Sequence, residues 1–158
     1  MWREVDSDDL LSMQRHCELL RKQFPEAYHA ALCTAGSLAS QVAAKHLRAF
    51  VYESEVDYIG FGIDYSASQQ SYCVTGLACD VDDPSIASEL FLSKLLDVVP
   101  IGQRILLTRP VTHPPIEAFS LLDWLEDAVC VHNRFVRGNH VDLFFQATSE
   151  EERWEIRT

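Results

Sequence analysis

The chain has 158 residues, of which 47% are hydrophobic and 23% are charged, values that indicate a folded globular protein and exclude a largely disordered one. Its formal net charge of −11 at pH 7 excludes a general nucleic-acid binder, because phosphate recognition depends on clustered lysine and arginine side chains. The charge suits a soluble acidic protein or one that meets a basic partner or substrate.

Residues 1–46 are predicted to form a helical N-terminal part. The first helix is expected to start after Asp6 or Ser7, so that Asp8-Asp9 lies in the positively polarised first turn, and to end before Pro25. Because the leading residues are polar, we expect no signal peptide.

A second helical stretch is expected from Glu26 to His46. Its pattern is interrupted near Gly36, where Thr34 or Ser37 offers a new N-cap. Alanines fill the middle of this stretch and allow close helix packing.

Three strand patterns follow, at Leu47–Glu53, Asp57–Tyr65 and Ser71–Cys79. Each is rich in β-branched and aromatic residues, and the turns between them are short. The sequence therefore predicts an antiparallel meander.

The next helix is predicted over Ser85–Val99, with Asp83 as N-cap and Pro84 at the first helical position. A short apolar strand at Arg104–Thr108 should lie parallel and next to the end of the meander. A further helix is expected at about Pro114–Glu126. The core residues predicted on these two helices are Ala87, Leu90, Phe91, Leu95, Phe119, Leu122 and Leu125.

Two last strands are predicted at Ala128–Val136 and His140–Ala147, and residues 149–158 are expected to be a surface tail. The chain is thus predicted to be a single domain of residues 1–158, in which 47–148 form a mixed sheet with two helices. The fold class is α/β, of the α+β type with a mixed sheet, in the order α-α-β-β-β-α-β-α-β-β.

Three local patterns and this order resemble the GNAT acyltransferase superfamily. Val56–Phe61 is similar to the family's third-strand signature, an acidic turn followed by an apolar residue and Gly-Phe. Leu77–Cys79 matches the end of its fourth strand, and Phe91–Leu96 matches its paired-leucine helix. The resemblance covers nearly the whole chain and implies a GNAT-like fold.

The cofactor loop departs from the family pattern, which is (Gln/Arg)-x-x-Gly-x-(Gly/Ala). The paired-leucine helix aligns residues 83–88, Asp-Pro-Ser-Ile-Ala-Ser, with that pattern, and no glycine lies between Gly76 and Gly102. Phosphate loops need free backbone N–H groups and no nearby negative charge. We therefore expect no cofactor. If acetyl-CoA does bind, the resemblance places it at Leu77, Cys79, Ser85 and Ala87.

The family's catalytic helix departs as well. Alignment places Pro115 at the position of an asparagine, Leu122 at that of the tyrosine that protonates the leaving thiolate, and Glu126-Asp127 at that of a Gly-Phe pair. The general acid is therefore missing from its expected place, and no catalytic residue is assigned.

Other candidate groups have simpler interpretations. His132, His140 and Asp142 share the predicted final hairpin, but with no fourth ligand they favour a surface pair over a metal site. His16 and Cys17 suggest a nucleophile, yet adjacent helical residues point about 100° apart.

Cysteines and aromatic residues favour packing roles. An odd number of cysteines without a CxxC pair is typical of reduced, buried thiols in an intracellular protein. Tyrosines concentrate on the meander, where cross-strand packing is favoured over partner anchoring. These residues are Cys17, Cys33, Cys73, Cys79 and Cys130, and Tyr52, Tyr58, Tyr65 and Tyr72.

The preferred hypothesis is a non-catalytic acyltransferase-like module for protein binding or inhibition. It would present an acidic surface to a protein with a basic surface, in the cytoplasm, without nucleic acid or membrane. The alternative is a divergent acyl-CoA-dependent N-acetyltransferase acting on an amine, and the sequence leaves enzymatic activity open. The candidate partner surface is Asp80, Asp82, Asp83 and Asp97, and the candidate bases of the alternative are Glu53, Glu55 and Asp64.

Overall fold

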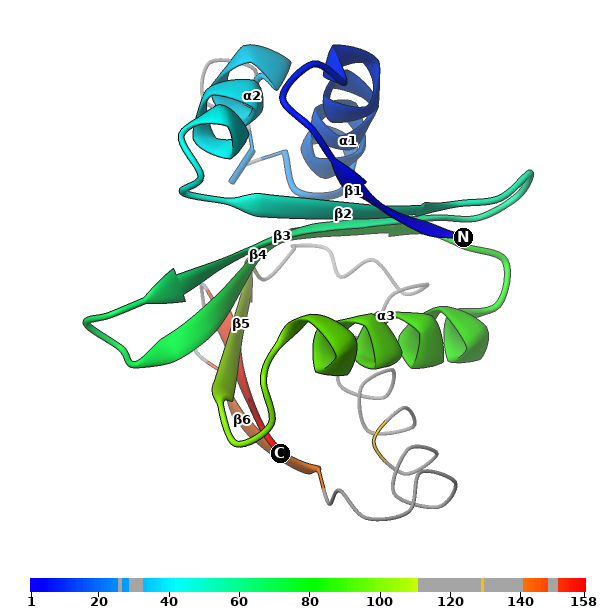
Figure 1. Cartoon of the computed structure of the whole chain (residues 1–158). Coiled ribbons are helices and arrows are strands. Elements are labelled where there is room, and N and C mark those ends of the chain that lie inside the picture. Colours follow the sequence, from blue (N-terminus) through cyan, green and yellow to red (C-terminus); the bar gives the residue numbers. More distant parts are fainter. Residues whose placement is uncertain (26, 29–32, 111–128, 130–140, 148–150) are drawn as a thin grey trace. The chain divides into compact units, whose positions relative to one another are not determined.

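The computed structural model describes residues 1–25, 27–28, 33–110, 129, 141–147 and 151–158 (Figure 1). The chain forms two compact units. Unit 1 contains Met1–Asp64 and Val74–Asp80, and unit 2 contains Tyr65–Cys73 and Val81–Thr158. No helix in the described part of the chain is long and apolar enough to cross a membrane.

The described strands form a mixed sheet in the order β1-β2-β3-β4-β5-β7-β6. The predicted α/β class is confirmed, and so is the expected neighbourhood of the fourth and fifth strands, which follow one another in this order. The meander is also confirmed as β2 (Arg48–Glu53), β3 (Tyr58–Ser66) and β4 (Ser71–Asp80), with β2 and β3 antiparallel.

In unit 1, α1 (Leu10–Gln23) and α2 (Ala35–Ala43) lie on one face of β1, β2 and β3 (Figure 1). Their apolar sides meet buried strand residues in two clusters that supply the core of this unit. The fully or nearly fully buried members are Val5, Met13, Val51 and Tyr58 in one cluster, and Cys17, Leu20, Phe24, Cys33 and Ala78 in the other.

The N-terminal part needs three corrections. A strand not predicted, β1 (Trp2–Val5), pairs antiparallel with β2 because its backbone completes that edge. The first helix begins at Leu10, since the Asp9 carboxylate accepts the backbone N–H of Ser12 at 3.3 Å and so caps it.

The second predicted helix is much shorter than expected. Ala27 and Tyr28 form a turn and a bend, and helix α2 begins only at Ala35. The predicted cap at Thr34 is confirmed, because its side chain accepts the Ser37 N–H at 3.1 Å.

In unit 2, α3 (Pro84–Val98) follows the predicted helix within one residue at each end. Its apolar stripe is confirmed by the burial of Ala87, Phe91 and Leu95, while Leu90 is half-buried. The predicted core residues Phe119, Leu122 and Leu125, and the helix that carries them, lie outside the described residues.

The C-terminal end of the chain is a strand and not a tail. Residues Glu151–Arg157 form β7, which pairs antiparallel with both β5 (Arg104–Pro110) and β6 (Asp142–Ala147). Trp154 and Ile156 are completely buried, and the charged residues that alternate with them, Arg153, Glu155 and Arg157, lie on the other face of the strand. Of the strand predicted at Ala128–Val136 only Val129 is described, and it is helical.

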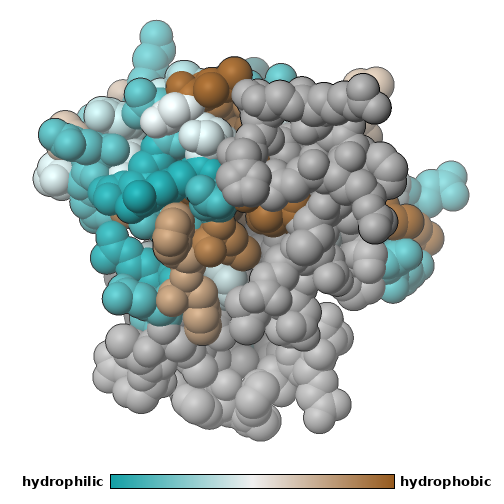
Figure 2. Space-filling view, turned by 90° about the horizontal axis from the view of Figure 1, so that it is seen from below, coloured by the Kyte–Doolittle hydropathy of each residue, from teal (hydrophilic) through white to brown (hydrophobic). Residues whose placement is uncertain are grey.

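Large apolar side chains also reach the surface. Figure 2 shows brown, hydrophobic areas next to teal, hydrophilic ones on one face. The exposed large apolar side chains on regular elements include Leu11 on α1, Ile86 on α3 and the adjacent Phe144 and Phe145 on β6. The exposure of single apolar side chains is ordinary for a soluble protein, whereas the exposure of two adjacent phenylalanines on one strand is unusual.

Candidate functional site

Strand β4 contains a backbone feature that only glycine adopts readily. Gly76 has φ +62°, the left-handed region, although it lies inside a strand. Interruptions of this kind bend a strand and free its backbone groups for other partners. In unit 1 those partners are two ring side chains.

His16 on α1 is one of these partners and is 9% exposed. Its Nδ1 lies 2.8 Å from the Tyr58 hydroxyl, and its ring also bonds the backbone of Gly76. Burial lowers the pKa of His16 to about 4, and the bond to Gly76 opposes that shift. The ring is therefore neutral at pH 7.

Gly60 on β3 makes room for the His16–Tyr58 pair. A Cβ at this position would lie 2.6 Å from both the His16 Nδ1 and the Tyr58 hydroxyl oxygen. The Gly60 predicted as part of a family signature thus has a steric role in this chain.

Tyr28, in the segment between α1 and α2, is the second partner of Gly76. Burial raises the pKa of Tyr28, and a hydrogen bond with the Gly76 backbone lowers it in part. Sequence reasoning missed both His16 and Tyr28 as neighbours of β4. The available signal for His16 was its helical spacing with the buried Met13 and Leu20.

The nucleophile hypothesis for Cys17 is not supported. Burial, followed by the contact with the Cys33 thiol, raises the pKa of Cys17 to about 12. The side chain therefore stays a protonated thiol in the core.

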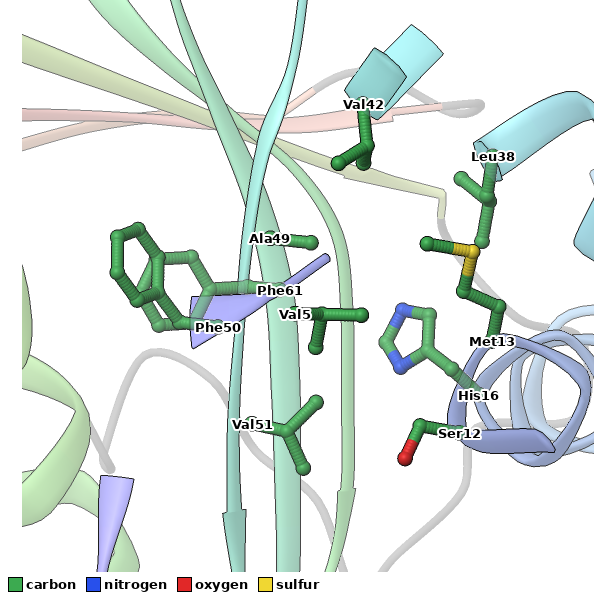
Figure 3. Close-up of a pocket in the computed structure, with 10 residues that line it drawn as sticks. All are labelled: Val5, Ser12, Met13, His16, Leu38, Val42, Ala49, Phe50, Val51 and Phe61. Carbon is green, nitrogen blue, oxygen red and sulfur yellow. The ribbon is translucent and has the colours of Figure 1, made fainter. Parts of the chain in front are cut away.

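A small cavity borders His16 (Figure 3). Its volume is about 30 Å³, and Met13, Val5 and Leu38 help to make its lining almost wholly apolar. In Figure 3 the His16 ring points from α1 toward the strands, beside Ser12 and Met13. A space of this size holds one water and no organic ligand.

The C-terminal end of β4 is already hydrogen-bonded from within unit 1. The Gln23 side-chain amide donates to the Cys79 carbonyl at 2.5 Å, while its own Oε1 is buried without a partner. The side chains of Leu77 and Cys79 are buried, so only their backbone is available to a ligand. Of the other two positions considered for acyl-CoA, Ala87 is buried, and the Ser85 side chain lies outside the described residues.

The start of α3 carries acidic side chains. Asp82 and Asp83 are exposed and come directly before Pro84, the first residue of the helix. Backbone helical bonding begins with the Ala87 N–H, which donates to the Asp83 carbonyl at 3.2 Å. Two carboxylates therefore flank the positive end of the helix dipole.

Of the acidic positions considered as a partner surface, those of unit 2 lie at opposite ends of one helix. Asp82 and Asp83 precede α3, whereas Asp97 lies in its last turn beside Lys94, at 3.5 Å. A helix of 15 residues is about 22 Å long. Asp80, in unit 1, is exposed at the end of β4.

The remaining candidates are limited. Glu53 lies 3.8 Å from Arg3 and 3.6 Å from Arg15, so its carboxylate is already ion-paired. Within the described residues, no three His, Cys, Asp or Glu side chains are grouped to hold a metal ion. His132 and His140, and the departures at Pro115, Leu122 and Glu126-Asp127, lie outside the described residues.

Sequence comparison and structural comparison give different answers. No protein-family model and no curated protein sequence matches the chain significantly. Solved structures do match, and they include three aminoglycoside acetyltransferases. The 6′-N-acetyltransferase from Enterococcus faecium is 14% identical, with a TM-score of 0.54 over 99% of this chain and 96% of that one.

The other two structures are similar to the same degree. The 6′-acetyltransferase type Ii is 13% identical, with a TM-score of 0.57 over 98% of this chain and 95% of that one. A 6′-N-acetyltransferase complexed with coenzyme A is 13% identical, with a TM-score of 0.58 over 99% and 96%. These similarities confirm the GNAT-like fold, and at such identities they show the fold alone.

Proposed function

We propose that this chain is a non-catalytic protein-binding or inhibitory module built on the acyltransferase fold. The start of α3 carries the proposal. A pyrophosphate needs several free N–H groups at a helix start, and here Pro84 lacks its N–H, while Asp82 and Asp83 repel the ligand.

The end of β4 supports the same conclusion. An extended ligand running beside this strand would hydrogen-bond its backbone, and the Gln23 amide already takes one acceptor position of the Cys79 carbonyl. Displacing Gln23 would leave a second buried polar atom without a partner, in addition to its Oε1. Both features disfavour acyl-CoA.

The partner that we propose is a protein with a basic surface. The chain has a net charge of −11, and the exposed Asp82 and Asp83 concentrate negative charge beside one helix end. Opposite charges at an interface increase association rates and make binding sensitive to salt. This acidic loop is the surface that we assign to the contact.

The experiment is affinity capture from the native host with quantitative mass spectrometry. Asp82→Lys combined with Asp83→Lys should release the partner, more so at low salt, because both changes replace attraction by repulsion. Asp97→Lys, at the other end of α3, is the matched control and should retain it. Equal capture by all three proteins would reject this surface. Saturable binding of acetyl-CoA would reject the non-catalytic function and favour the acetyltransferase alternative.

A further inference from the structure

The two strands at the ends of the described sheet are β1 and β6, and they differ in how their edges are protected. β1 has four residues, and its Arg3 and Glu4 are ion-paired with Asp9 and Arg48. Short, charged strands of this kind discourage pairing with another chain. The edge at β1 is therefore closed to further strands.

β6 lacks this protection. It has six residues, Asp-Leu-Phe-Phe-Gln-Ala, with a single charge at its first position. Phe144 is 49% exposed and Phe145 is 41% exposed, although β7 covers the other edge of the strand. In Figure 1, β6 is the orange strand beside the red β7. An edge with these properties is suited to pairing with a further strand.

The two faces of β6 have different chemistry. Leu143 and Phe145 lie opposite the fully buried Ile156 and Trp154, and the Phe145 and Trp154 ring centroids are 4.4 Å apart. Phe144 lies on the other face, under the Arg157 guanidinium at 5.0 Å. The face with Leu143 and Phe145 thus extends the buried apolar layer of β7 to the edge of the sheet, where this layer ends at the exposed Phe145.

We propose that β6 pairs antiparallel with β6 of a second copy of this chain. A two-fold axis perpendicular to the sheet leaves the same face of both strands on the same side of the joined sheet. Even-numbered residues must therefore oppose even-numbered ones, and odd-numbered residues odd-numbered ones. With the axis at Phe144, this residue meets its own copy, Leu143 meets Phe145, and Asp142 meets Gln146. Apolar side chains then oppose apolar ones, and the carboxylate opposes an amide.

The order of side chains along β6 is self-complementary, and for this reason we assign a second copy of the chain as the partner of this edge. On the apolar face, Phe145 of one chain lies between its own Trp154 and Leu143 of the other, which extends the buried layer across the axis. On the other face, an open hollow of about 420 Å³ is lined by Arg104, Arg153 and Glu155. Arg104 is paired with Glu155 at 3.0 Å, so the cation for the partner's Asp142 is Arg153, which lies opposite Gln146 on the same side of the sheet. Local charges therefore attract.

Long-range charge acts against this dimer, which gives it a distinctive salt dependence. Each chain carries −11, so two copies repel each other over distances up to about a Debye length, which is longer at low salt. Added salt screens this repulsion and leaves the apolar and backbone contacts intact. Dimerisation through β6 therefore strengthens with salt, whereas capture of a basic protein through Asp82 and Asp83 weakens.

Sedimentation equilibrium over a range of protein and salt concentrations tests the proposal. The wild-type mass should rise toward twice 17.9 kDa, and earlier at high salt. Phe144→Glu should keep the mass of one chain, because it places two carboxylates on the axis, while the circular dichroism spectrum stays that of the wild type. Leu11→Glu, at a residue 80% exposed on α1, is the control and should dimerise. A wild-type chain that stays monomeric throughout, or a Phe144→Glu chain that dimerises equally, would overturn the proposal.

Cysteine cross-linking tests the register. Phe144→Cys should form a disulfide-linked dimer in oxidised glutathione, because the two copies of this position face each other at the axis. Phe145→Cys and the wild-type chain, which has the native cysteines, are the controls and should remain unlinked. Cross-linking of Phe145→Cys instead would reject the register that places the axis at Phe144.

Discussion

Strand β4 in unit 1 and the start of α3 in unit 2 differ in the kind of polar group they carry. At β4, the side chains of His16 and Tyr58 are neutral, buried and hydrogen-bonded to each other, and the His16 ring also bonds the backbone of Gly76. At α3, Asp82 and Asp83 are charged and exposed. The two regions lie close together in the sequence but have opposite electrostatic environments.

The difference separates what the fold requires from what a cofactor requires. A positive-φ glycine and a tightly packed histidine keep the sheet in shape, and losing them costs stability whatever the protein binds. A glycine-rich helix start serves the ligand only. In the function proposed above, this chain keeps the structural feature and has replaced the phosphate-binding one, as can occur when a fold serves another use.

The largest effect should come from Leu95→Ala, which tests whether α3 is a sound structural helix apart from its start. Leu95 is completely buried, so its truncation should lower the free energy of unfolding by roughly 2–5 kcal/mol. Ile101→Ala, at a residue 73% exposed, is the control and should stay within about 0.5 kcal/mol of the wild type. Urea denaturation measures both, and equal midpoints would show that the buried face is misassigned.

The next effect is the pH dependence that the neutral His16 imposes. Its pKa is about 4 in the folded chain against 6.5 for the free side chain. Between these values the unfolded chain binds a proton that the folded chain does not. The free energy of unfolding therefore falls as the pH drops from 6.5 toward 4, and the full contribution of His16 is present above pH 6.5. The slope is about 1.4 kcal/mol per pH unit, or about 3 kcal/mol in total.

Denaturant titrations at several pH values measure this dependence. His16→Gln should remove it, while His46→Gln, at an exposed residue of the α2–β2 connection, should keep it. A direct titration of the His16 ring by nuclear magnetic resonance gives an independent check. A ring that titrates near 6.5 in the folded chain would show that the site at β4 is open to water.

A smaller effect is expected from Gly60→Ala. The added Cβ would lie 2.6 Å from the His16 Nδ1 and from the Tyr58 hydroxyl, so one of them must move, at a cost of about 1–3 kcal/mol. Gly36→Ala in α2 is the matched control. Nothing lies within 4 Å of a Cβ there, and the change should stabilise the helix by about 0.5–1 kcal/mol. If both variants change the melting temperature in the same direction relative to the wild type, the steric role assigned to Gly60 is contradicted.

The smallest effect is that of the cap on α2. Thr34→Ala removes the acceptor of the Ser37 N–H and should cost about 1 kcal/mol. Ser40→Ala, at an exposed position inside the same helix, is the control and should be neutral or slightly stabilising. Thermal melting compares the two, and a Thr34→Ala chain as stable as the Ser40→Ala chain would show that the cap contributes nothing.

Local patterns were sufficient for most of the fold. The β-branched and aromatic runs predicted β2, β3 and β4, and the caps and apolar stripe predicted α3. β1 was missed because four residues with two charges give no recognisable period. β7 was missed because Trp154 and Ile156 are the only apolar residues of its alternating pattern and follow an acidic run, which favours the interpretation as a surface tail.

The candidate site was less predictable. The acidic loop before α3 is contiguous in the sequence, so its chemistry could be stated in advance. The contacts among His16, Tyr58 and Gly76 join an α-helix to two strands and depend on tertiary packing, which no local period records. The Gln23 bond to the Cys79 carbonyl spans 56 residues and could not be inferred for the same reason.

A calorimetric titration of the wild-type chain with acetyl-CoA tests the central claim most directly. The charged start of α3 predicts no saturable heat and no stabilisation at millimolar ligand, under conditions where an acetyltransferase that binds coenzyme A gives both. A ligand present at 100 times its dissociation constant would add about 2.7 kcal/mol to the stability of the folded chain, which thermal melting detects readily. Saturable binding with a micromolar dissociation constant would contradict the account and make this chain a cofactor-binding acyltransferase.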